Sequence, residues 1–587
     1  MILQALTKYY ANRVELPDGY QKKEIPFIIT LDSQGRFVNL LDTRTVEGKI
    51  KRSRVCVVPR EIKRSGSKAW EKANLLWDTP AYAVGISSKD AENAKRKHAS
   101  FIKRFKEVFP SPSFDKGIAA VSVFLSGKGF EELLSHSSWP TVLETDGYLS
   151  FKLDGDERLI CERSAVKDSL SKSVTSQGKT SRGVCLVSGE DDGIAQLHNV
   201  IKGVRGAQSM GANIVSFNLA AFESFGKGQG YNAPIGKKTE FAYVTALNGL
   251  LDKDSRQKMQ VGDATTVFWA EKAHDMEKWF ADFFGEPPKG QSEQDSAAIK
   301  AIYEAPKTGA VPLLDDKTSF YVLGLAPNAS RIAIRFWYQG SVGEVSGNIK
   351  QHFDDIAIVH APKEPEHLSL FRLLVSTAVQ GKSENIQPNL AGEFMKTILT
   401  GAPYPQTLLS AAISRIRAEQ AKKDQNGKSM LNVTYSRAAL IKAILTRRAR
   451  YSKQEKKEVG MSLDTSNENP GYLLGRLFAV LERAQEQASP GINATIRDRF
   501  YGAASSTPVA VFAHLMKLKN HHIAKIDNKG MAINLEKQIG EIVDKLVADN
   551  AFPAHLPLDD QGRFAVGYYH QRQSFFIKKS DESTKEA

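Results

Sequence analysis

The 587-residue sequence is poor in cysteine: it has three, Cys56, Cys161 and Cys185, and they are far apart. So few and so scattered, they exclude a disulfide framework and a zinc knuckle, and we expect reduced, buried thiols in a cytoplasmic protein. No apolar run approaches the roughly 20 residues of a membrane-spanning helix. Residues 1–6 lack the charged and apolar regions of an export signal. We therefore expect no membrane partner.

Motifs that support catalysis are also scarce. The glycines at 226–230 have the wrong third spacing for a dinucleotide fingerprint, and Lys238 stands where a P-loop needs Ser or Thr. His274-Asp275 is the dipeptide of HD phosphohydrolases, but no further metal ligands follow it at helical spacing. His521-His522 has no carboxylate or cysteine at ligand spacing. The sequence thus predicts a protein without a metal, a cofactor or an enzymatic activity.

The sequence does have an excess of positive charge. Eighty Lys and Arg against 66 Asp and Glu give a net charge of +14, a balance typical of proteins with a polyanionic partner. Residues 366–460 contain 16 basic and 7 acidic side chains, whereas residues 461–587 contain 15 of each. The excess in the middle of the chain predicts a track for nucleic acid there.

Residues 211–234 form the segment around which we expect the function to be organised. An apolar run at 214–217 predicts a strand, and the loop after it has three glycines within 226–230. Glycines let a ligand approach the main chain closely, and amide side chains pair with base edges. A structural glycine-rich turn is the alternative interpretation. The candidates for base recognition in this loop are Asn218, Gln229 and Asn232.

A second polar loop follows the strand predicted at 55–59. It combines cations, small residues and an amide, a mixture suited to positioning a phosphate and recognising a base. A solvated run of charges is the alternative interpretation. The candidates in this loop are Lys63, Arg64, Ser65 and Asn74.

The fold class that we predict is α+β. Residues 1–365 mix helices with short strands without a regular βαβ alternation, so we expect an irregular mixed α/β domain. Strands are expected at 241–247, 265–269, 320–325 and 331–338, and a Lys/Arg-rich amphipathic helix at 91–109. From residue 366 to 587 the apolar spacing is helical and the loops contain Gly, Pro and Asn, which predicts a helical bundle.

Several longer motifs resemble the large subunit of the type I-C CRISPR surveillance complex (Cascade). The resemblance runs nearly from end to end and includes the segment 211–234. The other motifs that carry it are Met-Ile-Leu-Gln-Ala-Leu at 1–6, Val-Pro-Arg-Glu-Ile-Lys-Arg at 58–64, Leu-Trp-Asp at 76–78, Phe-Tyr-Val-Leu-Gly-Leu at 320–325, Arg-Phe-Trp-Tyr at 335–338, Val-Gln-Gly-Lys-Ser-Glu-Asn at 379–385, Asn-Ala-Thr-Ile-Arg-Asp-Arg at 493–499 and Gly-Tyr-Tyr-His-Gln-Arg-Gln at 567–573.

The resemblance implies a noncatalytic DNA-binding subunit. Guide RNA pairing recognises most of the target, while the large subunit recognises the protospacer-adjacent motif in duplex DNA and helps to start strand separation. It also holds the displaced single strand and recruits a helicase-nuclease. Further partners implied are the guide RNA, the backbone and RNA-processing subunits, and a small subunit.

Both polar loops are then candidates for recognising the motif, and a set of cations is the candidate path for the displaced strand. Such a path acts by neutralising phosphates and depends strongly on salt. The cations in it are Arg415, Arg417, Arg447, Arg448, Arg450, Arg497, Arg499, Lys517 and Lys525.

The family also has a small subunit that is translated from inside the same gene and corresponds to the C-terminal helices. Met461 is a candidate start, because Lys457-Glu458-Val459 can be encoded by a strong ribosome-binding sequence. Residues 461–587 would then be a separate, charge-balanced bundle.

Two other functions compete with this interpretation. A stand-alone nuclease or helicase would need a metal cluster or a P-loop, and neither is found in the sequence. A basic scaffold that binds guide RNA alone would need the positive segment but not the two polar loops.

Overall fold

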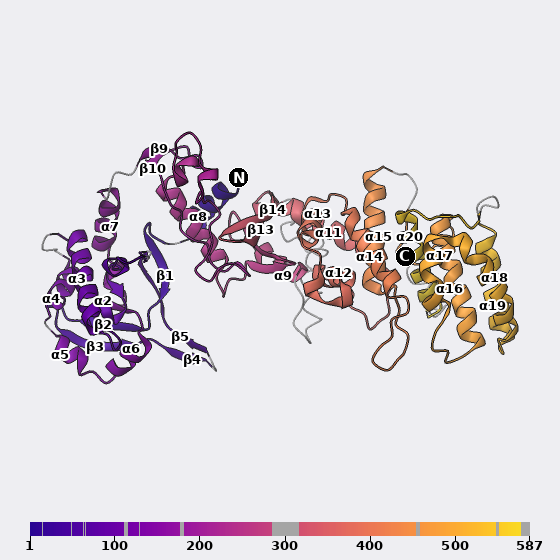
Figure 1. The fold of residues 1–587 in the computed structure, drawn as a ribbon, viewed down its shortest axis with the longest axis horizontal. Coiled ribbons are helices and arrows are strands. Elements are labelled where there is room, and N and C mark those ends of the chain that lie inside the picture. The colour runs from indigo at the N-terminus through magenta and orange to yellow at the C-terminus, as the bar shows by residue number, and fades with distance from the viewer. Residues whose placement is uncertain are drawn as a thin grey trace. The chain divides into compact units, whose positions relative to one another are not determined.

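The computed structural model divides the chain into two compact units. Unit 1 comprises Met1–Asn199 and Val215–Leu247, and unit 2 comprises Val200–Ile214 and Asn248–Ala587. Figure 1 shows the helices and strands of both units. The residues that the structure describes are 1–14, 16–47, 50–62, 64, 66–110, 115–127, 129–176, 181–284, 316–453, 458–546 and 551–576.

Unit 1 contains a four-stranded sheet with the strand order β3-β2-β8-β7. β2 (Phe27–Leu31) pairs antiparallel with β3 (Phe37–Asp42) and parallel with β8 (Leu149–Leu153), while β7 (Trp77–Asp78) lies at the edge. Every residue of β2 is buried, as expected of a central strand covered on both faces. The sheet and the helices on it enclose one hydrophobic core.

The strongly basic helix predicted at 91–109 is α3 (Ala91–Val108). It begins where Asp90 accepts a hydrogen bond from the main chain of Asn93, and it buries Phe101 and Phe105. The other elements of this part are β1 (Tyr20–Glu24), β4 (Thr45–Glu47), β5 (Ile50–Arg52), β6 (Val55–Pro59), α2 (Pro80–Ala83), α4 (Lys116–Phe124), α5 (Phe130–Leu134), α6 (Trp139–Thr145) and α7 (Ser164–Ser176).

The segment 215–234 lies in unit 1 with β9 (Arg182–Val184), β10 (Asp191–Gly193) and α1 (Ile2–Arg13). Two strand predictions here are wrong. Residues 241–247 belong to a helix, α8 (Lys237–Leu250), whose burial on several sides gives the continuous apolar run of a strand. Residues 214–217 form no strand, because the pairing ends in single bridges at Ala212 and Asn213.

Unit 2 begins with an antiparallel meander of four strands, β11 (Lys258–Val261), β12 (Ala264–Ala270), β13 (Ser319–Asn328) and β14 (Arg331–Ser341). These strands confirm the predictions at 265–269, 320–325 and 331–338. Phe268 and Phe320 share one core with residues of the helices that follow. The boundary predicted at residue 365 therefore falls inside a compact unit, because sheet and helices bury one another.

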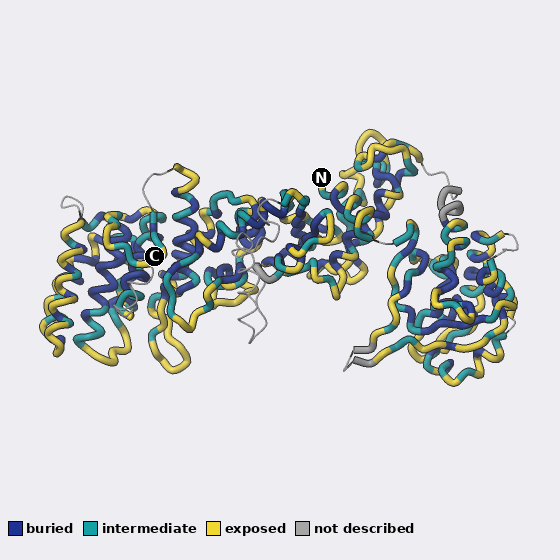
Figure 2. Tube along the Cα trace, turned by 180° about the vertical axis from the view of Figure 1, so that it is seen from behind, coloured by how far each residue is buried: buried dark blue, intermediate teal, exposed yellow. Residues whose placement is uncertain are grey.

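Five helices of unit 2 pack against α16 (Pro470–Ala488) or α20 (Leu558–Ser574), and Figure 2 shows these two largely in the colour of buried residues. The five are α14 (Gln406–Ala418), α15 (Tyr435–Tyr451), α17 (Ile496–Ser506), α18 (Phe512–Ala524) and α19 (Lys529–Val543). The two helices approach closely through glycines. A Cβ on Gly475 would lie 2.1 Å from the carbonyl oxygen of Phe564, and one on Gly567 would lie 2.3 Å from that of Tyr472. The other helices are α9 (Met276–Phe284), α11 (Val342–Ile356), α12 (Leu370–Thr377) and α13 (Leu390–Thr400).

The α+β class is thus confirmed, with mixed α/β structure first and helices after it. The three cysteines are free and buried, as predicted. No described helix is long and apolar enough to cross a membrane.

Candidate nucleic-acid interface

The loop in segment 211–234 ends in a tight hairpin, residues 223–232, which we call the Phe225 hairpin. The main-chain N–H of Lys227 donates to the carbonyl oxygen of Ser224 over 3.0 Å, which closes a two-residue turn. Phe225 and Gly226 occupy its centre with φ angles of 51° and 66°. Positive φ at both central positions is typical of a type I′ turn. The Phe225 side chain is 95% exposed.

Asn232 holds this hairpin in shape. Its Oδ1 accepts from the N–H of Ser224 over 2.9 Å, and its Nδ2 donates to the carbonyl oxygens of Lys227 and Gln229 over 2.7 and 2.9 Å. Both ends of the amide are therefore engaged within the loop. Asn232 thus fixes the loop, and its contact with a base stays a prediction.

The base of the hairpin is fixed to the segment before it. The N–H of Gly230 donates to the carbonyl oxygen of Gln196 over 2.9 Å, and a Cβ at position 230 would lie 2.4 Å from the oxygen of Ala195. Only glycine fits this approach. The hydrogen bonds of Asn232 and the close approach of Gly230 therefore fix the hairpin that exposes Phe225 to solvent. The exposed Lys227 lies two residues after Phe225.

Two other predicted base-recognition residues are not buried, Asn218 before the hairpin and Gln229 within it. Asn218 is exposed and Gln229 is half-buried, with a main-chain N–H that donates to Glu223 Oε1 over 2.9 Å. Phe225 was missed in the sequence. The available signal was an aromatic residue directly before a glycine in an otherwise polar loop, which is uncommon because bulky residues rarely adopt positive φ.

The second polar loop is held by a buried carboxylate. Asp78 is fully buried; it accepts from the N–H of Asn74 over 2.9 Å and forms an ion pair with Arg64. Arg64 also donates through Nε to the carbonyl oxygen of Lys72 over 2.7 Å, and its guanidinium lies 4.0 Å from the centre of the Tyr82 ring. Burial raises the pKa of Asp78, and the Arg64 guanidinium opposes that shift.

This arrangement corrects one prediction and limits another. Asn74 is 1% exposed, and its Oδ1 accepts from the N–H of Ile62 over 3.0 Å, so it supports the loop and does not reach a base. Arg64 is engaged with Asp78 and Tyr82, which makes it an anchor of the same loop. Lys63 and Ser65 lie outside the described residues.

Two of the cations predicted to bind the displaced strand are buried. Arg447 is 0% exposed and pairs with Asp355 over 2.8 Å, and Arg497 is 4% exposed and lies 3.8 Å from Glu482. A buried arginine with an internal carboxylate cannot contact a phosphate without breaking the core. The prediction is wrong for these two residues, because positive charge counted along a sequence includes charge that folding neutralises.

Three other cations are engaged in ion pairs nearer the surface. Arg415 lies 3.7 Å from Glu419, Arg448 pairs with Asp559 over 2.5 Å, and Arg450 pairs with Asp355. The side chain of Arg450 is 43% exposed. Each would have to exchange an internal carboxylate for a phosphate, so these residues are weaker candidates than the exposed cations.

Four predicted cations are exposed: Arg417 on α14, Arg499 on α17, and Lys517 and Lys525 at α18 and its end. The structure brings the first two together, because Arg417 Nε would lie 3.9 Å from a Cβ on Gly502, one turn along α17 from Arg499. The guanidinium of Arg499 lies 5.2 Å from the ring centre of Phe500. Exposed cations beside an aromatic ring are suited to single-stranded nucleic acid.

The residues considered for metal binding are used otherwise. His274 Nε2 lies 2.9 Å from Asp316 Oδ2, and Asp275 pairs with Lys278. Within the described ranges, no group of three His, Cys, Asp or Glu side chains is arranged to hold a metal ion.

A family model covers nearly the whole chain. The model, described as CRISPR-associated protein (Cas_Csd1), matches residues 6–576, a range that includes both polar loops and all the cations considered above. A search of curated proteins finds no match.

Proposed function

Because the chain belongs to the Cas_Csd1 family of CRISPR-associated proteins, we propose that it is the noncatalytic large subunit of a type I-C RNA-guided surveillance complex (Cascade). In such a complex the guide RNA recognises most of the target by base pairing, and the protein recognises a short motif in the flanking duplex. The proposed partners are target DNA, guide RNA, the backbone, RNA-processing and small subunits, and a helicase-nuclease that cuts.

The observation that carries the proposal is the Phe225 hairpin. An aromatic ring that is 95% exposed on a clamped turn has no role in the core of unit 1. Apolar side chains inserted between base steps unstack them, at a cost of about a few kcal/mol per step. Phe225 is suited to this insertion next to the recognised motif, and Lys227 is placed to neutralise a neighbouring phosphate.

We assign motif recognition to Asn218 and Gln229, the accessible amides near this hairpin. An amide side chain forms paired hydrogen bonds with adenine in the major groove, and each good pair contributes about 1–3 kcal/mol of discrimination. The exposed cations Arg417, Arg499, Lys517 and Lys525 are assigned to the displaced strand.

The assignment is tested with Gln229→Ala in the reconstituted complex. We expect weaker binding of duplexes that carry the motif, by roughly 5- to 100-fold, and unchanged binding of duplexes without it. Band shifts over a panel of single-base motif variants measure both. Phe222→Ala, a truncation of a partly exposed side chain just outside the hairpin, is the control.

An equal loss on all duplexes would mean that Gln229 contacts only phosphate or supports the loop, and it would contradict its role in recognition. Loss of binding with the Phe222→Ala control as well would show that the loop tolerates no truncation, in which case the side chain of Gln229 has no specific role.

A further inference from the structure

The basic residues of α3 lie on the face of the helix that does not enter the core. Ala94, Phe101, Phe105 and Val108 are buried. The side turned away from the core has Lys95, Ala99, Lys103 and Lys106, which we call the α3 basic face, and Ile102 at its edge is partly buried against the core. Spacings of four, eight and eleven residues from Lys95 keep these residues within one broad face of the helix, from which their side chains diverge.

The lysines of this face are not neutralised by the fold. Among the residues that the structure describes, no ion pair joins a carboxylate to Lys95, Lys103 or Lys106, and Glu107, four residues after Lys103, lies 3.9 Å from Arg104. All three lysines are exposed. This distinguishes them from Arg447 and Arg497, whose charges are balanced inside unit 2.

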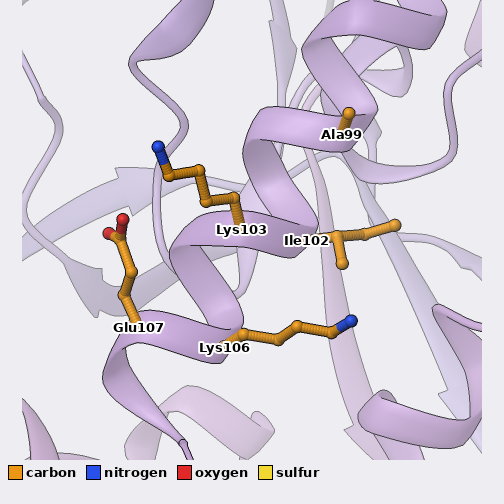
Figure 3. Close-up of a pocket in the computed structure, with 5 residues that line it drawn as sticks. All are labelled: Ala99, Ile102, Lys103, Lys106 and Glu107. Carbon is orange, nitrogen blue, oxygen red and sulfur yellow. The ribbon is translucent and has the colours of Figure 1, made fainter.

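The surface between the lysines is shallow and partly apolar. Figure 3 shows Ala99, Ile102 and Lys106 along one side of α3 and Lys103 with Glu107 on the other. An open depression beside Ala99 is lined by Ile102, Lys103, Lys106 and Glu107. Aliphatic stems beside cationic heads suit a ligand whose surface alternates between anionic and less polar groups, as the phosphates and sugars of nucleic acid do.

Two other cations of α3 contact the second polar loop. The guanidinium of Arg96 lies 4.3 Å from the ring centre of Trp70, and Lys97 lies 5.6 Å from that of Tyr82, the ring that Arg64 also covers. The exposed Lys68 lies in the same loop. These contacts pack α3 against the second polar loop, and Arg96 and Lys97 lie outside the α3 basic face.

The length of the face matches a nucleic-acid strand. Lys95 and Lys106 are eleven residues apart, which is about 16 Å along a helix. A strand of B-form DNA carries one phosphate for each ~3.4 Å of axis, so the face spans about five phosphates. A membrane surface is a poorer fit, because the apolar side of α3 is buried in unit 1 and has nothing to insert into lipid.

From this geometry we propose that the α3 basic face binds the phosphate backbone of nucleic acid without regard to sequence. The inference rests on the proposed function and adds to it a second contact, separate from the Phe225 hairpin. The occupant that we propose is the duplex flanking the target, because the length of the face matches the phosphate spacing of a B-form strand. The other source of the same chemistry, the guide RNA, is an outcome of the test.

The test is the triple variant Lys95→Gln, Lys103→Gln, Lys106→Gln in the full complex. Its control, Lys272→Gln, Lys363→Gln, Lys529→Gln, removes the same charge from exposed lysines elsewhere. Binding of duplexes with and without the motif is measured between 50 and 200 mM salt. For each phosphate that the variant no longer neutralises, the slope of log affinity against log salt falls by about 0.9. We expect the slope to fall by two to three times this amount, equally for duplexes with and without the motif.

A second measurement separates the two sources. The ratio of guide RNA to protein is measured in the purified complex by absorbance. A lower ratio with an unchanged duplex slope would show that the face binds guide RNA instead and would overturn the inference. The inference is overturned if the triple variant and its control have the same salt slope and the same ratio of guide RNA to protein. It is also overturned if the only defect of the triple variant is in assembly with a protein subunit. The two proposals can fail separately. If the α3 triple variant behaves like its control while Gln229→Ala weakens the binding of motif-bearing duplexes, the α3 inference fails and the proposed function stands.

Discussion

At the scale of single residues, Phe225 and Asn232 depend on one another. A bulky side chain at positive φ costs of order 1–3 kcal/mol and persists only where its surroundings enforce the conformation. Asn232 does this with three hydrogen bonds to the main chain on both sides of the turn. The side-chain amide of Asn232 thus stabilises the strained backbone of Phe225, and this backbone conformation exposes the Phe225 ring.

Replacing Asn232 by Ala should therefore loosen the hairpin without unfolding unit 1. Each of its hydrogen bonds contributes about 0.5–1.5 kcal/mol, so we expect hydrogen exchange at the amides of Ser224 and Lys227 to become at least tenfold faster. Exchange in β2 should not change. Opening of the first target base pairs should slow as it does in Phe225→Ala.

Unchanged exchange at Ser224 would show that the turn forms without the clamp. Phe222→Ala is the matched control, since it alters a neighbouring residue and leaves every hydrogen bond of Asn232 in place.

The sequence predicts which residues are polar but not which of them are buried. Amides and cations can be counted in a loop, so both polar loops could be identified. Which of them face inward could not be predicted: Asn74 and Arg64 are held by Asp78, whose burial depends on the whole sheet. Likewise Arg447 and Arg497 were predicted to bind nucleic acid because they are cations. Their carboxylate partners, Asp355 and Glu482, become visible only in the folded structure.

At the scale of elements, helices with one apolar stripe were predictable and helices buried all round were not. α3 lies where its apolar spacing predicted a helix, at 91–109, whereas part of α8 has the pattern of a strand. In α20 the buried positions include glycines, His570 and Gln571 beside apolar residues, so no stripe is visible. Its place is set by the contact with α16.

The glycines at that contact give a prediction for stability. Gly475→Ala should destabilise unit 2 by about 1–3 kcal/mol, because the new Cβ would overlap the carbonyl oxygen of Phe564. Gly540→Ala on α19 is the control: no heavy atom lies within 4 Å of its added Cβ, and alanine in a helix interior stabilises by roughly 0.5–1 kcal/mol. Thermal unfolding of both variants measures the difference.

A Gly475→Ala variant as stable as the wild type would contradict the close crossing of α16 and α20. A destabilised Gly540→Ala variant would show instead that any alanine at these helix positions is unfavourable.

At the scale of the whole molecule, unit 2 has one core that extends from Val261 to Tyr569. Residues after Met461 share it with the preceding helices: Gly562 of α20 faces Ile441 and Leu445 of α15, and a Cβ added there would lie 3.1 Å from Ile441. A separate product made from Met461 would expose this apolar side of α20. We therefore expect such a product to self-associate or to require a partner surface.

Internal translation itself is tested in the natural gene. Replacing Met461 and recoding the codons of 457–459 should abolish a short C-terminal product on an immunoblot, while full-length protein persists. A short product that survives both changes rules out this start. Wild-type product that stays monomeric and fully folded at high concentration would contradict the expected exposure of α20.

We propose that this chain recognises and opens duplex DNA and that another protein cuts it. The most direct measurement places 2-aminopurine at the first target base pair beside the motif and follows its fluorescence with the complex, without any helicase-nuclease. We expect the wild-type complex to unstack the base rapidly and Phe225→Ala to slow unstacking by roughly 5- to 100-fold. On a pre-opened target the two complexes should react at equal rates, and the DNA strands should stay intact throughout. Strand cleavage by the complex, or opening as fast with Phe225→Ala as with the wild type, would contradict this proposal.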